Sequence, residues 1–395
     1  MRKAILHIGL EKTGSTAIQE FLWINRRTLL DQHQIWTPDY LGRGSQWPLA
    51  VLAYNASQED DLTSSLGSPA ARIAKLEEIR KKITFSANHQ PANLFCFSSE
   101  HLSSRLTTTD HICSLRDFFS DLFDDLEVVV YVREPIRMAI SRQSTAVKLG
   151  HGAFRLPEPS QIAAALDFQV VIQRWESAFG KNLRVRLYDE SASEFDIISD
   201  FQSLLGLSSP LNPEIIRPKR TNPSLNWNHL RLMSGINAVA QRQLGRPLPN
   251  TILHYITNVL EEAEPTRGPR SPAYKPTKKQ AESYQLYFCR QNEWLFNTYF
   301  PDRPFQWAPP SQESTDDVDV ETSIDLSDSE EILCKLLVGL SAGTTAPWAD
   351  IAEHLSQMAW KMKKQEPFNL HDQEASERFC AQIKSALSND RFNLI

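Results

Sequence analysis

Residues 4–30 read AILHI, GLEKTGST and AIQEFLWINRRTLL in succession. The first run, 4–8, is short and apolar, as expected of a buried strand, and the last has the apolar spacing of a helix over 15–30. A glycine-rich turn between a strand and a helix brings backbone N–H groups and the positive end of a helix dipole to one point, where they attract phosphate. The stretch therefore predicts an anion-binding turn at residues 9–16.

Strand and helix patterns alternate over the first half of the chain. Further strand-like runs are NLFCFSS (93–99), LEVVVYV (126–132) and LRVRLYD (183–189). Helical patterns lie between them at 70–88, 110–124, 135–149 and 160–179. The β-branched run at 126–132 is typical of a parallel strand buried on both faces. The alternation predicts an α/β fold, a P-loop-type three-layer sandwich with a central parallel sheet, and ligands beyond the carboxyl ends of the strands.

Strand patterns stop after residue 208, which indicates a change of organisation. Helical patterns continue at 225–244, 250–263 and 276–298. Residues 311–331 contain nine Asp and Glu residues and no Lys or Arg, a composition that predicts a flexible linker. The helical patterns beyond it predict a C-terminal helical appendage. We therefore expect three parts: an α/β domain at 1–308, an acidic linker at 309–329 and a small helical module at 330–395 that could bind a protein partner.

Composition limits the classes of function. The net charge of −6 is concentrated in the acidic linker, so the rest of the chain is slightly basic, which suits an anionic ligand but is too weak to indicate nucleic acid. The five cysteines are scattered without a C-x-x-C pair, so neither a zinc knuckle nor a disulfide framework is indicated. We find neither an apolar run of membrane-spanning length nor a signal-peptide core. These features predict a cytoplasmic enzyme.

The position of the lysine distinguishes this turn from a nucleotide-triphosphatase P-loop. In G-x-x-x-x-G-K-[ST] the lysine follows the last glycine and the hydroxyl residue holds magnesium. Here Lys12 precedes Gly14, and Ser15 and Thr16 begin the helix. We expect Lys12 on the turn, beside the last group of a bound phosphate chain. No Asp or Glu cluster near the turn suggests a metal.

The K-T-G-S-T order resembles the sulfotransferases that use 3′-phosphoadenosine 5′-phosphosulfate (PAPS). In that family a strand followed by a K-x-G-[ST]-[ST] turn grips the 5′-phosphosulfate, and the lysine neutralises charge on the bridging oxygen as it leaves. The family needs no magnesium. The resemblance implies a catalytic role for Lys12. It also implies that five residues of the turn bind PAPS: Lys12, Thr13, Gly14, Ser15 and Thr16.

A second motif, REPIRMAIS (133–141), follows the strand pattern at 126–132. The family places an arginine at such a strand end and a serine eight positions on, and both hold the 3′-phosphate of the nucleotide. The resemblance assigns these roles to Arg133 and Ser141, and guanidinium geometry suits a phosphate.

The resemblance covers about residues 1–308, ending in FCRQNEWLFNTYFPDRPFQW (288–307), which is similar to the closing helix of bacterial polysaccharide-type members. One departure concerns the R-K-G-x-x-G-D-W-K stretch of cytosolic small-molecule members, which is absent. RPKRTNPSLN (217–226) has a comparable place in the chain. Arg217, Lys219 or Arg220 could therefore close over the 3′-phosphate.

The run LFCFSSEHLSS (94–104) contains Glu100 and His101, just beyond a predicted strand. Family members that act on carbohydrates often use a glutamate or histidine in this region as the base, so Glu100 is the first candidate and His101 the second. Glu11 and His7, near the turn, are further candidates. The alternative is structural: Glu100 caps a helix that begins near Leu102, because helix N-termini attract acids, and His101 is a surface residue.

Three functions remain open on the sequence. The resemblance implies transfer of a sulfuryl group from PAPS, as co-substrate, to a hydroxyl of a carbohydrate or glycolipid. An ATP-dependent P-loop kinase is the first alternative; the displaced lysine and the missing magnesium-binding acid count against it. A catalytically inactive nucleotide-binding scaffold, recruiting partners through its C-terminal part, is the second.

Overall fold

The computed structural model describes residues 2–54, 58–188, 195–207, 214–218, 225–262, 273–303 and 307. The chain forms two compact units. The first comprises Met1–Met138, Pro159–Asn222 and Tyr284–Pro309. Within the described residues, the second comprises parts of Ala139–Glu158 and Pro223–Ser283. The predicted linker at 309–329 and helical module at 330–395 lie outside the described residues, and the predicted domain boundaries stay predictions.

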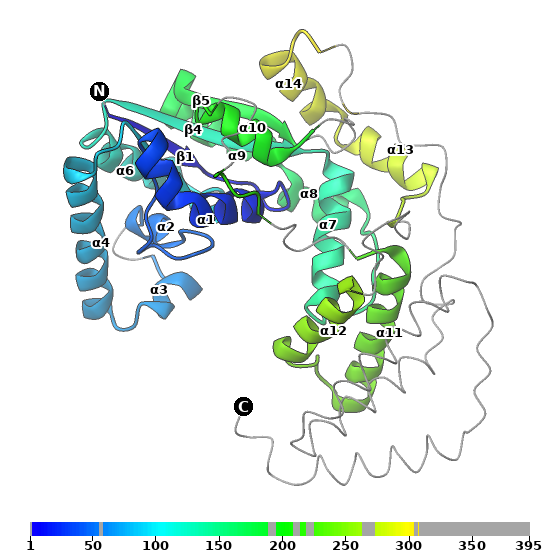
Figure 1. Ribbon diagram of the computed structural model, residues 1–395. Coiled ribbons are helices and arrows are strands. Elements are labelled where there is room, and N and C mark those ends of the chain that lie inside the picture. Colours follow the sequence, from blue (N-terminus) through cyan, green and yellow to red (C-terminus); the bar gives the residue numbers. More distant parts are fainter. Residues whose placement is uncertain are drawn as a thin grey trace, which may run out of the picture. The chain divides into compact units, whose positions relative to one another are not determined.

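A five-stranded sheet in the order β2-β3-β1-β4-β5 forms the centre of the first unit, and all its strand pairs are parallel. Figure 1 labels three of these strands, β1, β4 and β5. The strands are β1 (Lys3–His7), β2 (Ile35–Trp36), β3 (Leu94–Ser98), β4 (Asp125–Arg133) and β5 (Leu183–Tyr188). In this register His7, the last residue of the central strand β1, lies opposite Ser98 of β3 and Val129 of β4. The predicted α/β class with a central parallel sheet is confirmed.

Helices connect the strands of the first unit and cover the sheet. They are α1 (Ser15–His33), α2 (Pro48–Leu52), α3 (Asp61–Ser65), α4 (Pro69–His89), α5 (Glu100–Arg105), α6 (Thr109–Ser120), α8 (Pro159–Leu166), α9 (Phe168–Phe179), α10 (Ile197–Leu204) and α14 (Cys289–Tyr299). Most begin at a side-chain cap, which satisfies an N–H group that the helix itself cannot. The caps are Asp60, Ser68, Ser99, Thr108, Asp167 and Asp196.

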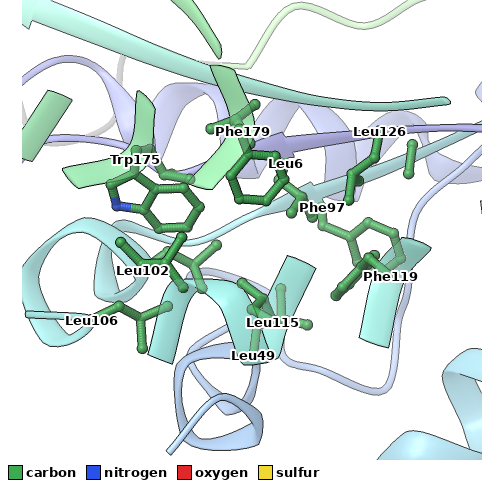
Figure 2. Packing of buried hydrophobic residues seen from close by; sticks show 14 of the residues in the cluster. Leu6, Leu49, Phe97, Leu102, Leu106, Leu115, Phe119, Leu126, Trp175 and Phe179 are labelled. Atoms are coloured by element: carbon green, nitrogen blue, oxygen red, sulfur yellow. The ribbon is translucent and has the colours of Figure 1, made fainter. Parts of the chain in front are cut away.

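Alternate residues of the strands enter two different apolar cores, as the two-residue repeat of a strand requires. Leu6 and Phe97 pack with α2, α6 and α9, whereas Ile5 and Tyr131 pack with α1 and α10. Figure 2 shows the first core, in which Leu6 and Phe97 lie among Leu115, Phe119 and Trp175. The sheet is therefore the middle of three layers.

The second unit contains α11 (Trp227–Leu244) and α12 (Asn250–Glu262). The helix α7 (Pro135–Lys148) begins in the first unit and continues into the second, and α13 (Lys278–Tyr287) spans the other junction. Within the second unit, the buried Asn237 donates from Nδ2 to the carbonyl oxygens of Val147 (2.8 Å) and Gly152 (2.9 Å). These bonds hold α11 to the end of α7.

Two helices predicted as continuous are interrupted. The pattern at 160–179 forms α8 and α9, because Asp167 accepts a hydrogen bond from Val170 N (3.0 Å) and starts a new helix. The pattern at 276–298 forms α13 and α14, because Phe288, with φ −95° and ψ 11°, leaves helical geometry. The two-residue strand β2 was not predicted, since two residues show no periodicity.

The order of the strands locates the place where a ligand is expected. From β1 the chain passes to β2 at one edge of the sheet, whereas from β4 it passes to β5 at the other edge. In open parallel sheets, ligands bind outside the carboxyl ends of two neighbouring strands whose connections diverge in this way. The expected site therefore lies beyond His7 of β1 and Arg133 of β4. Within the described ranges, no helix combines the length and the apolar composition needed to cross a membrane.

We expect Phe97→Ala to lower the free energy of unfolding by about 3–5 kcal/mol, because it leaves a cavity in a close-packed core. Phe97 is fully buried, and its ring centroid lies 4.9 Å from that of Phe119. Phe85→Ala is the control, because Phe85 is 60% exposed, and a change within about 0.5 kcal/mol is expected. Urea denaturation followed by circular dichroism measures both. Equal losses would contradict the packing described.

Candidate functional site

The turn between β1 and α1 has an unusual backbone. Gly9, Lys12 and Gly14 have φ of 43°, 64° and 82°. Left-handed residues turn successive N–H groups towards one side, which forms an anion-binding concavity. Gly14 occupies the N-cap position of α1, where no side chain makes a capping hydrogen bond and no acid stands in the first turn. The positive end of α1 is therefore not satisfied by a side-chain cap, unlike most helices of this unit.

Both glycines of the turn are required by space as well as by φ. A Cβ at Gly14 would lie 2.9 Å from Tyr188 Cε2 and 3.0 Å from Ile197 Cγ1. A Cβ at Gly9 would collide with Ser15 Oγ. The end of β5 and the start of α10 thus press against the turn, and a larger residue at either glycine would displace it.

The three hydroxyl residues of the turn differ in environment. Thr13 is fully buried, and its Oγ1 donates to Leu10 O (2.7 Å). Ser15 is also buried and makes a longer contact to the same carbonyl (3.4 Å). Thr16 is exposed. In this structure the first two hydroxyls stabilise the turn, and Thr16 is the one in contact with solvent.

Arg133 brings a positive charge to the turn. It is the last residue of β4 and only 8% exposed. Its Nη1 donates to Lys12 O (2.8 Å), and its Cζ lies 5.1 Å from the centre of the Tyr188 ring. The guanidinium is thus held between the turn and the end of β5. The structure brings together Lys12 and Arg133, two of the residues predicted to bind the nucleotide.

Ser141 lies further along α7, in the second unit, where its carbonyl oxygen accepts from Thr145 Oγ1 (3.0 Å). Its predicted partnership with Arg133 stays a prediction. Of the residues predicted to close over the 3′-phosphate, Arg217 pairs with Asp196 (2.9 Å) and bonds Ser199 Oγ (2.6 Å). Lys219 and Arg220 lie outside the described residues.

Glu100 lies beside the turn as the first residue of α5. Its Cα is 3.5 Å from the Cβ position of Gly9, and Ser103 Oγ of the same helix donates to Gly9 O. Its carboxylate Oε2 accepts from Gln19 Nε2 of α1 (2.6 Å). The carboxylate is therefore hydrogen-bonded by α1, the helix that follows the turn.

The capping role considered for Glu100 belongs to another residue. The helix begins at Glu100 rather than near Leu102, and its cap is Ser99, which accepts from the N–H of His101 (3.3 Å). Glu100 is an acid of the first turn, where a negative charge is favourable. His101 is half-buried.

His7, a further candidate for the base, is fully buried. Its Nδ1 lies 2.7 Å from Ser98 Oγ, and its ring forms T-shaped pairs with Tyr131 and Phe201, with both pairs of centroids 5.8 Å apart. Burial lowers the pKa of His7 to about 3, because the charged form would lose its hydration. This burial counts against His7 as the base. Glu11, the other candidate, is exposed on the turn.

Sequence reasoning did not identify Gln19 or Tyr188 as parts of the site. Gln19 is only 5% exposed and falls on the buried face of α1 together with Ile18 and Leu22. The signal available in the sequence was an amide side chain within the apolar stripe of a predicted helix. Tyr188 gave no such signal, because a tyrosine at a strand end is common. Among the residues that the structure describes, no three or more His, Cys, Asp and Glu side chains are grouped so as to hold a metal ion.

Comparison with known proteins finds a distant structural likeness. No family model matches the chain, and no curated protein does. Among solved structures, it is similar to a sulfotransferase from Alicyclobacillus acidocaldarius with 14% sequence identity and a TM-score of 0.35. The similarity covers 64% of this chain and 99% of that one. A likeness of this size carries no argument, so the case for a function rests on the site.

We expect Gly14→Ala to destabilise the protein by about 2–4 kcal/mol, combining a left-handed conformation with overpacking against Tyr188. Gly206→Ala is the control, because Gly206 has a similar φ of 73° but nothing within 4 Å of its Cβ position; a loss of about 1–2 kcal/mol is expected. Denaturation midpoints measure the difference. If the two variants lose the same stability, the close approach of Tyr188 is not a constraint.

Proposed function

We propose that this protein is a sulfotransferase that moves a sulfuryl group from PAPS to a hydroxyl group of an acceptor. The observation that carries the proposal is the convergence of three features beyond the carboxyl ends of β1, β3 and β4. These are the turn at the N-terminus of α1, the guanidinium of Arg133 on the carbonyl of Lys12 (2.8 Å), and the carboxylate of Glu100 held by Gln19 (2.6 Å). An anion site beside a carboxylate suits transfer of an anionic group with removal of a proton.

The turn would hold the 5′-phosphosulfate of PAPS. N–H groups and the helix dipole attract such anions at a helix N-terminus. In the reaction, the bond from sulfur to the bridging oxygen breaks, and its electron pair stays on the phosphate of adenosine 3′,5′-bisphosphate. Lys12 and the turn would stabilise this developing charge, since donors already in place need no rearrangement as the charge appears.

Glu100 would act as the base. The acceptor oxygen forms a new bond to sulfur while its proton passes to the carboxylate, so the products are a sulfate ester, adenosine 3′,5′-bisphosphate and protonated Glu100. His101, the next residue, is the second candidate. Because Gln19 occupies Oε2, Oε1 is the oxygen proposed to receive the proton. General-base assistance of this kind contributes roughly 10²–10⁴-fold in rate.

Arg133 and Ser141 are proposed to bind the 3′-phosphate, as the resemblance of their motif implies. Arg133 has a second role in supporting the turn, because it already bonds the Lys12 carbonyl. A carbohydrate or glycolipid acceptor, a cytoplasmic location and a protein partner for residues 330–395 stay predictions from the sequence.

Nucleotide binding without magnesium tests the donor site. We expect the protein to bind adenosine 3′,5′-bisphosphate more tightly than adenosine 5′-monophosphate. Ser141→Ala should weaken the bisphosphate about tenfold or more and the monophosphate less than twofold, because a lost hydrogen bond to a charged phosphate affects the bisphosphate alone. Arg133→Ala should weaken both, because the turn loses its support. Calorimetry with the two nucleotides measures this.

Ser177→Ala is the control, because Ser177 lies on α9 and its Oγ bonds only its own helix at Arg174 O (2.8 Å). Equal weakening of both nucleotides by Ser141→Ala would remove Ser141 from the 3′-phosphate site. Binding of ATP that requires magnesium, with no preference for the bisphosphate, would favour a kinase instead.

Turnover tests the base. Glu100→Gln keeps the size of the side chain but cannot accept a proton, so transfer of label from ³⁵S-PAPS to an acceptor panel or to water should fall by roughly 10²–10⁴-fold. Bisphosphate affinity should stay within twofold. Glu20→Gln is the matched control, since Glu20 lies on α1 and pairs with Arg43 (3.0 Å). If His101→Ala loses activity while Glu100→Gln keeps it, the roles of the two residues are reversed.

A further inference from the structure

Gln19 is the polar residue that joins the anion-binding turn to the candidate base. It lies on α1 four positions after Ser15, which places both residues on the same face of the helix. Its side chain is buried, and Nε2 lies 2.6 Å from Glu100 Oε2. An ionised carboxylate only accepts hydrogen bonds, so the amide nitrogen, not the amide oxygen, must face it.

The backbone of Glu100 and its carboxylate are held by different contacts. Ser99 caps the helix, and Ser103 Oγ bonds the Gly9 carbonyl, so the first turn of α5 is fixed against the loop after β1. These contacts fix the position of the Glu100 backbone but not the direction of its carboxylate. The bond from Gln19 fixes the end of the side chain.

We propose that Gln19 is the positioning residue for Glu100. Its N–H holds Oε2 and leaves Oε1 for the proton of the acceptor. The inference rests on the proposed role of Glu100 as base. The donor-binding turn and the base are then held by neighbouring turns of one rigid helix, so their separation does not depend on a flexible loop. Such precision matters, because a displacement of about 1 Å can cost a catalytic group roughly 10²-fold in rate.

The bond to Glu100 can be observed directly. In the full chain labelled with ¹³C-glutamate at pH 7, the carboxyl signal of Glu100 is identified by its loss in Glu100→Gln. In Gln19→Met, which keeps side-chain length but donates no hydrogen bond, this signal should change its chemical shift, because Oε2 loses its donor. Gln19→Asn keeps an amide but withdraws it by one methylene, and it should move the signal in the same direction.

Gln32→Met is the matched control, because Gln32 also lies on α1 and donates to a glutamate, Glu214, away from the turn. This variant should leave the Glu100 carboxyl signal unchanged. The kcat of sulfate release from ³⁵S-PAPS at pH 7 should fall about tenfold or more in Gln19→Met, while KM for PAPS stays within twofold. Bisphosphate affinity should stay within twofold.

Two results separate the possible failures. If Gln19→Met binds the bisphosphate like the wild type but leaves the Glu100 carboxyl signal or kcat unchanged, Gln19 does not position the base. If the wild-type chain itself does not bind the bisphosphate, the proposed function is wrong, and the role of Gln19 in it falls as well.

Discussion

The sharp turn at residues 9–14 is the constraint on which the site depends. It reverses the chain between β1 and α1 with three residues at positive φ. The rest of the site is built around that shape. Arg133 bonds its backbone, Tyr188 packs against Gly14, and α5 is anchored to the Gly9 carbonyl. A change in the turn would therefore displace both Arg133, at the end of β4, and Glu100, at the start of α5.

The helix α1 extends this control to two other segments. The amide of Asn25 is bonded on both sides to Ile216, donating to its oxygen (2.8 Å) and accepting from its nitrogen (2.7 Å). Glu20 pairs with Arg43 in the loop between β2 and α2. Together with Gln19, these side chains make α1 the element from which the surroundings of the turn are positioned. Asn25 and Gln19 are buried, and their bonds fix geometry because leaving a buried polar group unpaired is costly. The pair with Arg43 is exposed and contributes little.

Local patterns predicted much of the fold, and non-local contacts made up most of what was missed. The apolar run of β4 and the glycine turn carry their own signals, so the parallel sheet and the sharp turn after its first strand could be expected from them. The break at Asp167 could not be expected, because the helical pattern continues through it. The break is set by Asp167 itself, whose side chain caps a new helix. The bond between Gln19 and Glu100 joins residues 81 positions apart. Sequence reasoning could propose Glu100 from its place after a strand, but not the amide that holds it.

Lys12 adopts φ 64° without being a glycine. For a residue with a Cβ this conformation costs roughly 1–2 kcal/mol, and glycine would adopt it without that strain. A search for stabilising substitutions would therefore return glycine at position 12, and the resulting protein would lose the ammonium group at the turn. Stability and charge make opposite demands on this residue. The backbone strain at position 12 is thus the stability lost by having a lysine there instead of a glycine.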